Sequence, residues 1–269
     1  MRNKIVTILL FAFFLSFMSS CKGSENNIPG EPPSHPRIML LKGEEDQIEQ
    51  TILTDRQWLT VSSYILDKSD AIIELPPVER VLIGRRLLDK SREALRRIFY
   101  LSYSYRKTGN EKFLARAEKE MLAVAAFTDW NPSHFLDVAE MTMAMAIGYD
   151  WLYDKLPEDS RNIIRTAIVE KGLSPSLLPQ NSSWANGSNN WNQVCNAGMV
   201  FGALAVWEDH TDLAKKIIDR AVTSTALPME EYNPDGAYPE GYGYWGYGTS
   251  FHVMFLSAME KAFGSFYKL

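Results

Sequence analysis

The chain has 269 residues, of which 46% are hydrophobic and 23% charged, with a formal net charge of −5 at pH 7 and a pI of about 5.5. This acidic balance argues against nucleic acid and anionic membrane surfaces as partners, but it leaves room for an anionic sugar bound in a local groove. The sequence contains no P-loop, nucleophile motif or Cys/His metal cluster, so we expect no cofactor and no metal.

The first 21 residues are typical of a bacterial export signal. Arg2 and Lys4 precede an apolar run at 5–18, which is shorter than the roughly 20 residues of a membrane span. The tetrapeptide MSSC at 18–21 resembles a lipobox, in which Cys21 becomes lipidated. We therefore expect an exported lipoprotein of the periplasm or outer membrane; the alternative is a plain secretory signal with an incidental cysteine.

Residues 22–36 are rich in Pro, Gly and small polar residues and predict a flexible tether. The folded body is expected over 37–269, a length that can bury a substantial core. Cys195 is the only other cysteine, so the mature chain has no internal disulfide and depends on that core for its stability.

Apolar residues recur with helical spacing through the body, and no segment alternates with the period of two that is typical of a strand. We expect an all-α fold of antiparallel helical hairpins. The predicted helices span 92–105, 113–127, 135–153, 157–169, 192–207, 212–226 and 249–263. Within 135–153 and just after it, an amphipathic pattern favours surface or buried-pair roles for Glu140, Asp150 and Asp154.

Residues 172–207 contain no Asp, Glu, Lys, Arg or His. Inside this span, NGSNNWNQVCN (186–196) clusters asparagines around one glutamine. Carboxamides donate and accept hydrogen bonds without titrating. Helix capping by Asn accounts for one or two of them, and a functional surface is the interpretation favoured for the rest.

Residues 236–248, GAYPEGYGYWGYG, combine tyrosines and glycines with Trp245 and the single charge of Glu240. Each glycine costs about 1 kcal/mol relative to alanine inside a helix, so this stretch predicts a loop. Phenol hydroxyls and flat aromatic rings suit a sugar, which has C–H faces and hydroxyl edges.

These two stretches resemble the heparinase II/III-like polysaccharide lyases, which include oligoalginate lyases. The motifs that carry the resemblance are NNWNQVCNAG (189–198), PDGAYPEGYGYWGYG (234–248), HPRIML (35–40), FLDVAE (135–140) and AIGYDWLYD (146–154). The resemblance implies an incomplete α/α toroid, truncated before the family's C-terminal β-sandwich, with a substrate cleft formed by loops at one end.

The resemblance also implies β-elimination at a uronic acid in an acidic polysaccharide such as heparan sulfate or alginate. A base removes the C5 proton, a donor stabilises the carboxylate, and an acid protonates the leaving oxygen. Asn190, or alternatively Asn192, is the predicted carboxylate donor, and Tyr247, or alternatively Tyr244, is the predicted acid. The predicted substrate-binding residues are Trp191, Glu240, Tyr242, Trp245 and His134.

The sequence offers several candidates for the catalytic base. Tyr247 would need a depressed pKa to serve as one. His134 opens a predicted helix and is a minor candidate for the cleft, whereas His35 and His210 are expected in solvated structural positions. His252 follows Tyr247 by five residues, on another helical face.

Two other classes of function fit part of the pattern. Asp235 and Glu240 near an aromatic loop are compatible with an inverting glycoside hydrolase on an α/α toroid. A carbohydrate-binding lipoprotein without catalysis would need only the stacking faces of the aromatic side chains.

Overall fold

The computed structural model describes residues 30–265, and the fold of this part is all-α. Its only β-type pairing is an isolated bridge between Ile83 and Arg86. The helices are α2 (Glu45–Thr54), α3 (Arg56–Ile73), α4 (Leu88–Thr108), α5 (Glu111–Ala125), α6 (Phe135–Leu152), α7 (Glu158–Ala167), η1 (Ile168–Leu173), η2 (Ser174–Leu177), η3 (Pro179–Asn181), η4 (Ser183–Asn186), α8 (Asn190–Ala205), α9 (Thr211–Ser224), α10 (Ala226–Glu230) and α11 (Tyr242–Phe263). Helices α2 and α3 are not among the helices predicted from the sequence.

The predicted export signal and Cys21 lie outside the described residues. None of the helices within 30–265 combines the length and apolarity that crossing a bilayer requires. The described end of the predicted tether, residues 30–36, is irregular.

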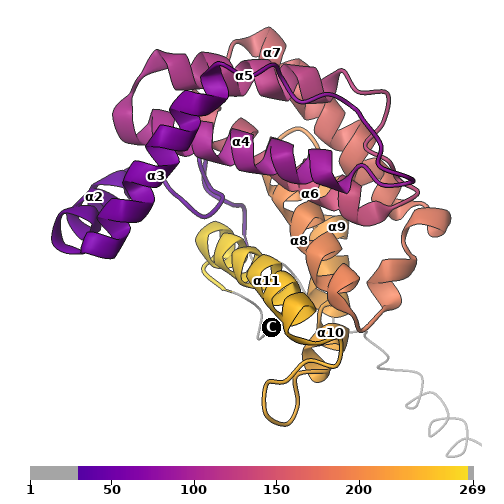
Figure 1. The fold of residues 1–269 in the computed structure, drawn as a ribbon. Coiled ribbons are helices and arrows are strands. Elements are labelled where there is room, and N and C mark those ends of the chain that lie inside the picture. Colours follow the sequence, from indigo (N-terminus) through magenta and orange to yellow (C-terminus); the bar gives the residue numbers. More distant parts are fainter. Residues whose placement is uncertain (1–29, 266–269) are drawn as a thin grey trace, which may run out of the picture.

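The spatial order of the main helices follows their order in the chain (Figure 1). Helix α4 packs against α6, α6 against α8, and α8 against α11, while α5 and α9 pack behind α4 and α8. An ion pair between Lys261 and Glu44 then connects the end of α11 to the residue before α2. These contacts between neighbours place α4, α6, α8 and α11 in one curved layer, and α5 and α9 in a second layer behind it.

Helix ends follow local chemistry. Asp55 accepts hydrogen bonds from backbone N–H groups at the start of α3, and Asn110 and Asn189 do the same for α5 and α8, satisfying donors that a first helical turn leaves free. Helices α4 and α11 end at Gly109 and Gly264, which adopt the left-handed conformation that glycine tolerates best.

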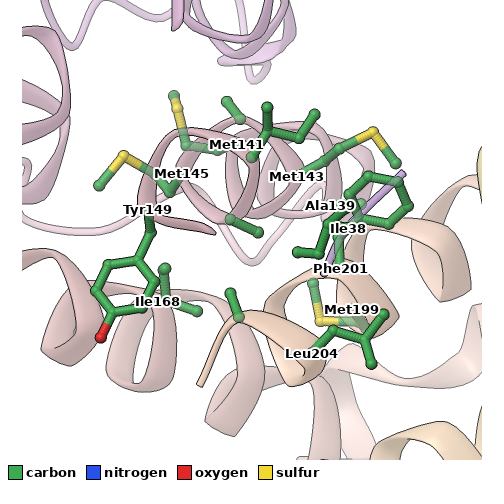
Figure 2. Packing of buried hydrophobic residues seen from close by; sticks show 14 of the residues in the cluster. Ile38, Ala139, Met141, Met143, Met145, Tyr149, Ile168, Met199, Phe201 and Leu204 are labelled. Carbon is green, nitrogen blue, oxygen red and sulfur yellow. The ribbon is translucent and has the colours of Figure 1, made fainter. Parts of the chain in front are cut away.

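Helix α6 is buried along its whole length, so the prediction of an amphipathic helix is wrong. Helices α4, α5, α7 and α8 cover its different sides. Methionines fill part of the surrounding space, and Figure 2 shows Met141, Met143 and Met145 on α6 and Met199 of α8 in the same apolar cluster. The flexible thioether side chain of methionine suits such irregular gaps.

A buried polar cluster attaches the segment before α2 to the end of α6. The Asp150 carboxylate accepts hydrogen bonds from His35 Nδ1 at 2.5 Å, from Arg37 N at 2.9 Å and from Ile38 N at 2.8 Å. Burial lowers the pKa of His35, but hydrogen bonds to Asp150 and Glu208 outweigh this effect and raise the pKa above its ordinary value. His35 is therefore buried rather than solvated, and the packed body begins at this residue.

Helices α6 and α8 approach so closely that one glycine has no room for a side chain. A Cβ atom on Gly198 would lie 2.2 Å from the backbone oxygen of Ala139. We expect Gly198→Ala to lower the free energy of unfolding by about 1–3 kcal/mol, because a backbone atom in a packed core cannot move aside cheaply. Denaturant titration measures this change.

The matched control is Gly246→Ala in α11, where a Cβ would meet nothing within 4 Å. Here the higher helix propensity of alanine should raise stability by about 0.5–1 kcal/mol. Equal effects of the two substitutions would contradict the close approach of α6 and α8.

Candidate functional site

A cleft of about 440 Å³ lies where α4, α6, α8 and α11 begin. Its lining residues are Arg86, Leu88, Arg92, His134, Leu136, Trp191, Gly243, Tyr244 and Tyr247. All four helices therefore present their N-terminal ends to one cleft. Since the N-terminus of a helix carries partial positive charge, this end of the molecule favours an anionic ligand.

His134 lines the cleft, is 2% exposed, and is fixed by two neighbouring side chains. Its Nδ1 is 2.6 Å from Asp137 Oδ1, and its ring meets Trp191 edge to face with centroids 4.8 Å apart. Asp137 is fully buried and also accepts hydrogen bonds from Leu87 N and Asn131 Nδ2, both at 2.6 Å. A carboxylate acceptor places the proton on Nδ1, which leaves Nε2 as the basic nitrogen.

Tyr247 belongs to a second polar cluster, which surrounds the buried Glu140. Its hydroxyl donates to Glu140 Oε1 at 2.5 Å, and Arg92 Nε donates to the same oxygen at 3.1 Å. The Arg92 guanidinium also lies over the Tyr247 ring, 5.1 Å from its centroid. Within this group Glu140 is 1% exposed.

Burial and neighbouring charges shift the pKa values of Glu140 and Tyr247. Burial raises the pKa of Glu140, although Tyr247 and Arg92 act in the opposite direction. Burial, and then the charge of Glu140, raise the pKa of Tyr247 well above its usual value. The phenol therefore keeps its proton at neutral pH, which suits a proton donor and not the base role considered for Tyr247 above.

Asn190 is the first residue of α8 and pairs with Glu240. Its Nδ2 lies 3.0 and 2.9 Å from the two carboxylate oxygens of Glu240, and its backbone N donates to Oε2 at 2.8 Å. Glu240 thus caps the N-terminus of α8, a favourable place for an anion. Asn190 does not line the cleft, although the next residue, Trp191, does.

Asn192 is fully buried and performs a structural task. Its Nδ2 donates to the backbone oxygen of Gly187 at 2.8 Å and to Ser224 Oγ at 2.9 Å, while its Oδ1 accepts from Asn196 at 2.8 Å. These bonds connect α8 to the end of α9 and to the turn after η4. The amide is therefore not directed at the cleft.

The stretch 242–248 is helical, so the prediction of a loop over the whole of 236–248 is wrong. It forms the first turns of α11. A Cβ on Gly248 would lie 2.2 Å from Gln193 Oε1, whereas Gly243 and Gly246 face open space. Tertiary packing of α11 on α8 thus outweighs the low helix propensity of glycine.

The aromatic residues of this stretch divide into two groups. Tyr244 and Tyr247 line the cleft. Tyr242 is 93% exposed, Trp245 Nε1 donates to the backbone oxygen of Gly236 at 3.0 Å, and Tyr238 is buried with its hydroxyl 3.4 Å from Ser188 O. These three residues do not line it.

Arg86, Arg92 and Asp137 are not among the predicted site residues, and Glu140 is predicted only for a surface or buried-pair role; it is buried and paired with Arg92. Asp137 follows His134 by three residues, a spacing that brings two side chains together at a helix start, and this was the signal available. Nothing in the local sequence distinguishes Arg86 or Arg92 from the other arginines of the chain.

Neither the protein-family models nor the curated proteins contain a match to this chain.

Removing the Glu240 carboxylate tests whether it stabilises the start of α8, which carries Trp191 in the cleft lining. We expect Glu240→Ala to reduce the free energy of unfolding by about 0.5–2 kcal/mol, the range typical of a lost N-terminal cap. Urea titration followed by tryptophan fluorescence measures the loss.

Asp235→Ala is the control in the same segment, because the Asp235 side chain is exposed and, among residues 30–265, accepts a hydrogen bond only from the nearby Ala237 N. A loss no greater than that of the control would show that Glu240 does not stabilise α8.

Proposed function

We propose that this protein is a polysaccharide lyase related to the heparinase II/III-like family and that it cleaves a uronic-acid-containing glycan by β-elimination. The observation that carries the proposal is that His134, backed by Asp137, and Tyr247, backed by Glu140, line one cleft together with stacking aromatic faces. Together they provide a base, an acid and a sugar platform.

The helix order supports an incomplete α/α toroid as the scaffold of this proposal. Helices α4, α6, α8 and α11 pack one against the next with their N-termini at the cleft, and α5 and α9 lie behind them. An inner layer of helices that share one direction, backed by a second layer, is the arrangement expected of such a toroid.

In the proposed reaction His134 Nε2 removes the proton from C5 of the uronic acid. The C–H electron pair forms the C4–C5 double bond, and the C4–O bond breaks. The Tyr247 hydroxyl turns from Glu140 and gives its proton to the leaving oxygen. Arg92, over the Tyr247 ring, stabilises the negative charge that forms on the phenol, and exchange with solvent restores both side chains.

The proposal does not use Asn190 or Asn192 as carboxylate donors. Both amide groups are committed inside the fold, to Glu240 and to backbone and serine oxygens respectively. Asn190 contributes indirectly, because its pairing with Glu240 fixes the start of α8 and hence the position of Trp191.

The geometry favours elimination over hydrolysis. An inverting hydrolase needs two carboxyl groups about 6.5–9.5 Å apart at the scissile bond, yet neither Asp nor Glu is among the residues that line the cleft. Glu240 and Asp235, the carboxylates considered for that role, lie elsewhere. Glu140 contacts Tyr247 from behind.

Incubation with heparan sulfate, hyaluronan, alginate and pectin tests the reaction. We expect ultraviolet-absorbing unsaturated products from at least one polymer, with turnover about 10²–10⁴-fold lower in Tyr247→Phe and in His134→Asn. The asparagine retains a donor for Asp137 but lacks Nε2. Circular dichroism and thermal unfolding verify that both variants fold.

Tyr242→Phe is the matched control, since Tyr242 is 93% exposed and lies outside the cleft lining; its turnover should equal that of the wild type. Saturated reducing ends in place of unsaturated products would identify a hydrolase. Binding without any cleavage would identify a carbohydrate-binding protein.

We also propose export as a lipoprotein, supported by the signal-like residues 1–21 and the MSSC motif. Expressed in a bacterial host, the wild type should label with a fatty-acid analogue and fractionate with membranes. Cys21→Ser should abolish the label and release the protein from the membrane fraction or leave it unprocessed. Unchanged fractionation of this variant would contradict the lipid anchor.

A further inference from the structure

Arg86 presents a positive charge to the cleft. It precedes α4, is exposed, and is one of the residues that line the cleft. Within residues 30–265, no hydrogen bond or ion pair involves its guanidinium group. Five donors in a planar fork are therefore available to a ligand.

The backbone that carries Arg86 is fixed on both sides. The carbonyl of Arg85 accepts from Asn131 Nδ2 at 2.8 Å, and Leu87 N donates to Asp137 Oδ2 at 2.6 Å. Arg86 itself exchanges two backbone hydrogen bonds with Ile83, at 2.9 and 3.2 Å. The carboxylate that orients His134 thus also fixes the segment that presents Arg86.

The charges around the cleft distinguish its two arginines. Arg92 donates to the buried Glu140, so a carboxylate of the protein already balances its charge. The lining residues provide no carboxylate for Arg86, and the N-termini of four helices add to the positive potential around it. An acidic group of a ligand is the partner that would balance this charge.

We infer that Arg86 is the specificity-determining residue of the cleft and that it binds a carboxylate or sulfate of the bound sugar. This inference rests on the proposed function and deepens it, because it assigns anion recognition to an arginine outside the asparagine cluster. The guanidinium fork matches either group with two parallel hydrogen bonds. The glycan must then carry acidic groups, and a neutral glycan binds poorly.

The test compares neighbouring arginines in the full chain. Arg85 is also exposed, also lacks a side-chain partner within residues 30–265, and does not line the cleft. Calorimetry measures the Kd of acidic tetrasaccharides from the polymer that the wild type prefers, and turnover assays give KM and kcat. The wild type is compared with Arg86→Gln, Arg86→Lys and Arg85→Gln.

We expect Arg86→Gln to raise Kd and KM about 10- to 100-fold, as for the loss of a hydrogen bond to a charged group, with a smaller change in kcat. Arg86→Lys should recover part of the affinity because it keeps the charge without the fork. Arg85→Gln should resemble the wild type. Added salt should weaken binding less in Arg86→Gln than in the wild type.

Chemically modified oligosaccharides distinguish the two anions. If carboxyl reduction abolishes the difference between Arg86→Gln and wild type, the carboxylate is the group bound; if desulfation abolishes it, the sulfate is. Equal affinities of Arg86→Gln and Arg85→Gln for a tetrasaccharide that the wild type binds would overturn the inference alone. A wild type that binds no acidic tetrasaccharide would overturn the proposed function as well.

Discussion

Three carboxylates on one buried helix organise the rest of the structure. Asp137, Glu140 and Asp150 all lie on α6 and are at most 1% exposed. A buried carboxylate is costly unless it is hydrogen-bonded, so each of them draws donors from distant parts of the chain. Asp150 binds the segment at His35, and Asp137 accepts a hydrogen bond from Leu87 just before α4. Glu140 accepts hydrogen bonds from the side chains of Arg92 and Tyr247. The packing of α6 thus positions both the N-terminal segment and the cleft.

The polar groups of the cleft are hydrogen-bonded by two of these carboxylates, and this depends on their positions along α6. Asp137 and Glu140 lie in the first turns, next to the N-termini of α4, α8 and α11, and they satisfy the polar groups of the cleft from behind. The rest of α6 packs through methionines and small residues, as Figure 2 shows. One helix therefore carries polar anchors near both ends and apolar core between them, and its first turns hold both the proposed base, through Asp137, and the proposed acid, through Glu140.

The asparagine cluster makes hydrogen bonds inside the fold, whereas its composition favours a functional surface. Asn192 and Asn196 form a buried network with Ser224, and Asn190 pairs with Glu240. Carboxamides serve this purpose well because they satisfy several backbone oxygens without burying a charge. The absence of charged residues from 172–207 therefore reflects the burial of α8, whose first turns carry this amide network and whose remainder is apolar core.

Local sequence determined the helical class and most helix positions after residue 88, and it singled out Trp191, Tyr244 and Tyr247, which line one cleft, because helical periodicity and unusual composition are local signals. It could not determine that 242–248 is helical, since the low propensity of glycine is offset by the packing of α11 on α8, where Gly248 lies against Gln193. Nor could it show that Tyr247 lines the cleft while Tyr242 is exposed outside it, or distinguish Arg86 from Arg85. Those differences depend on which side chains meet across helices more than a hundred residues apart, as Glu140 and Tyr247 do, and only the tertiary structure decides such meetings.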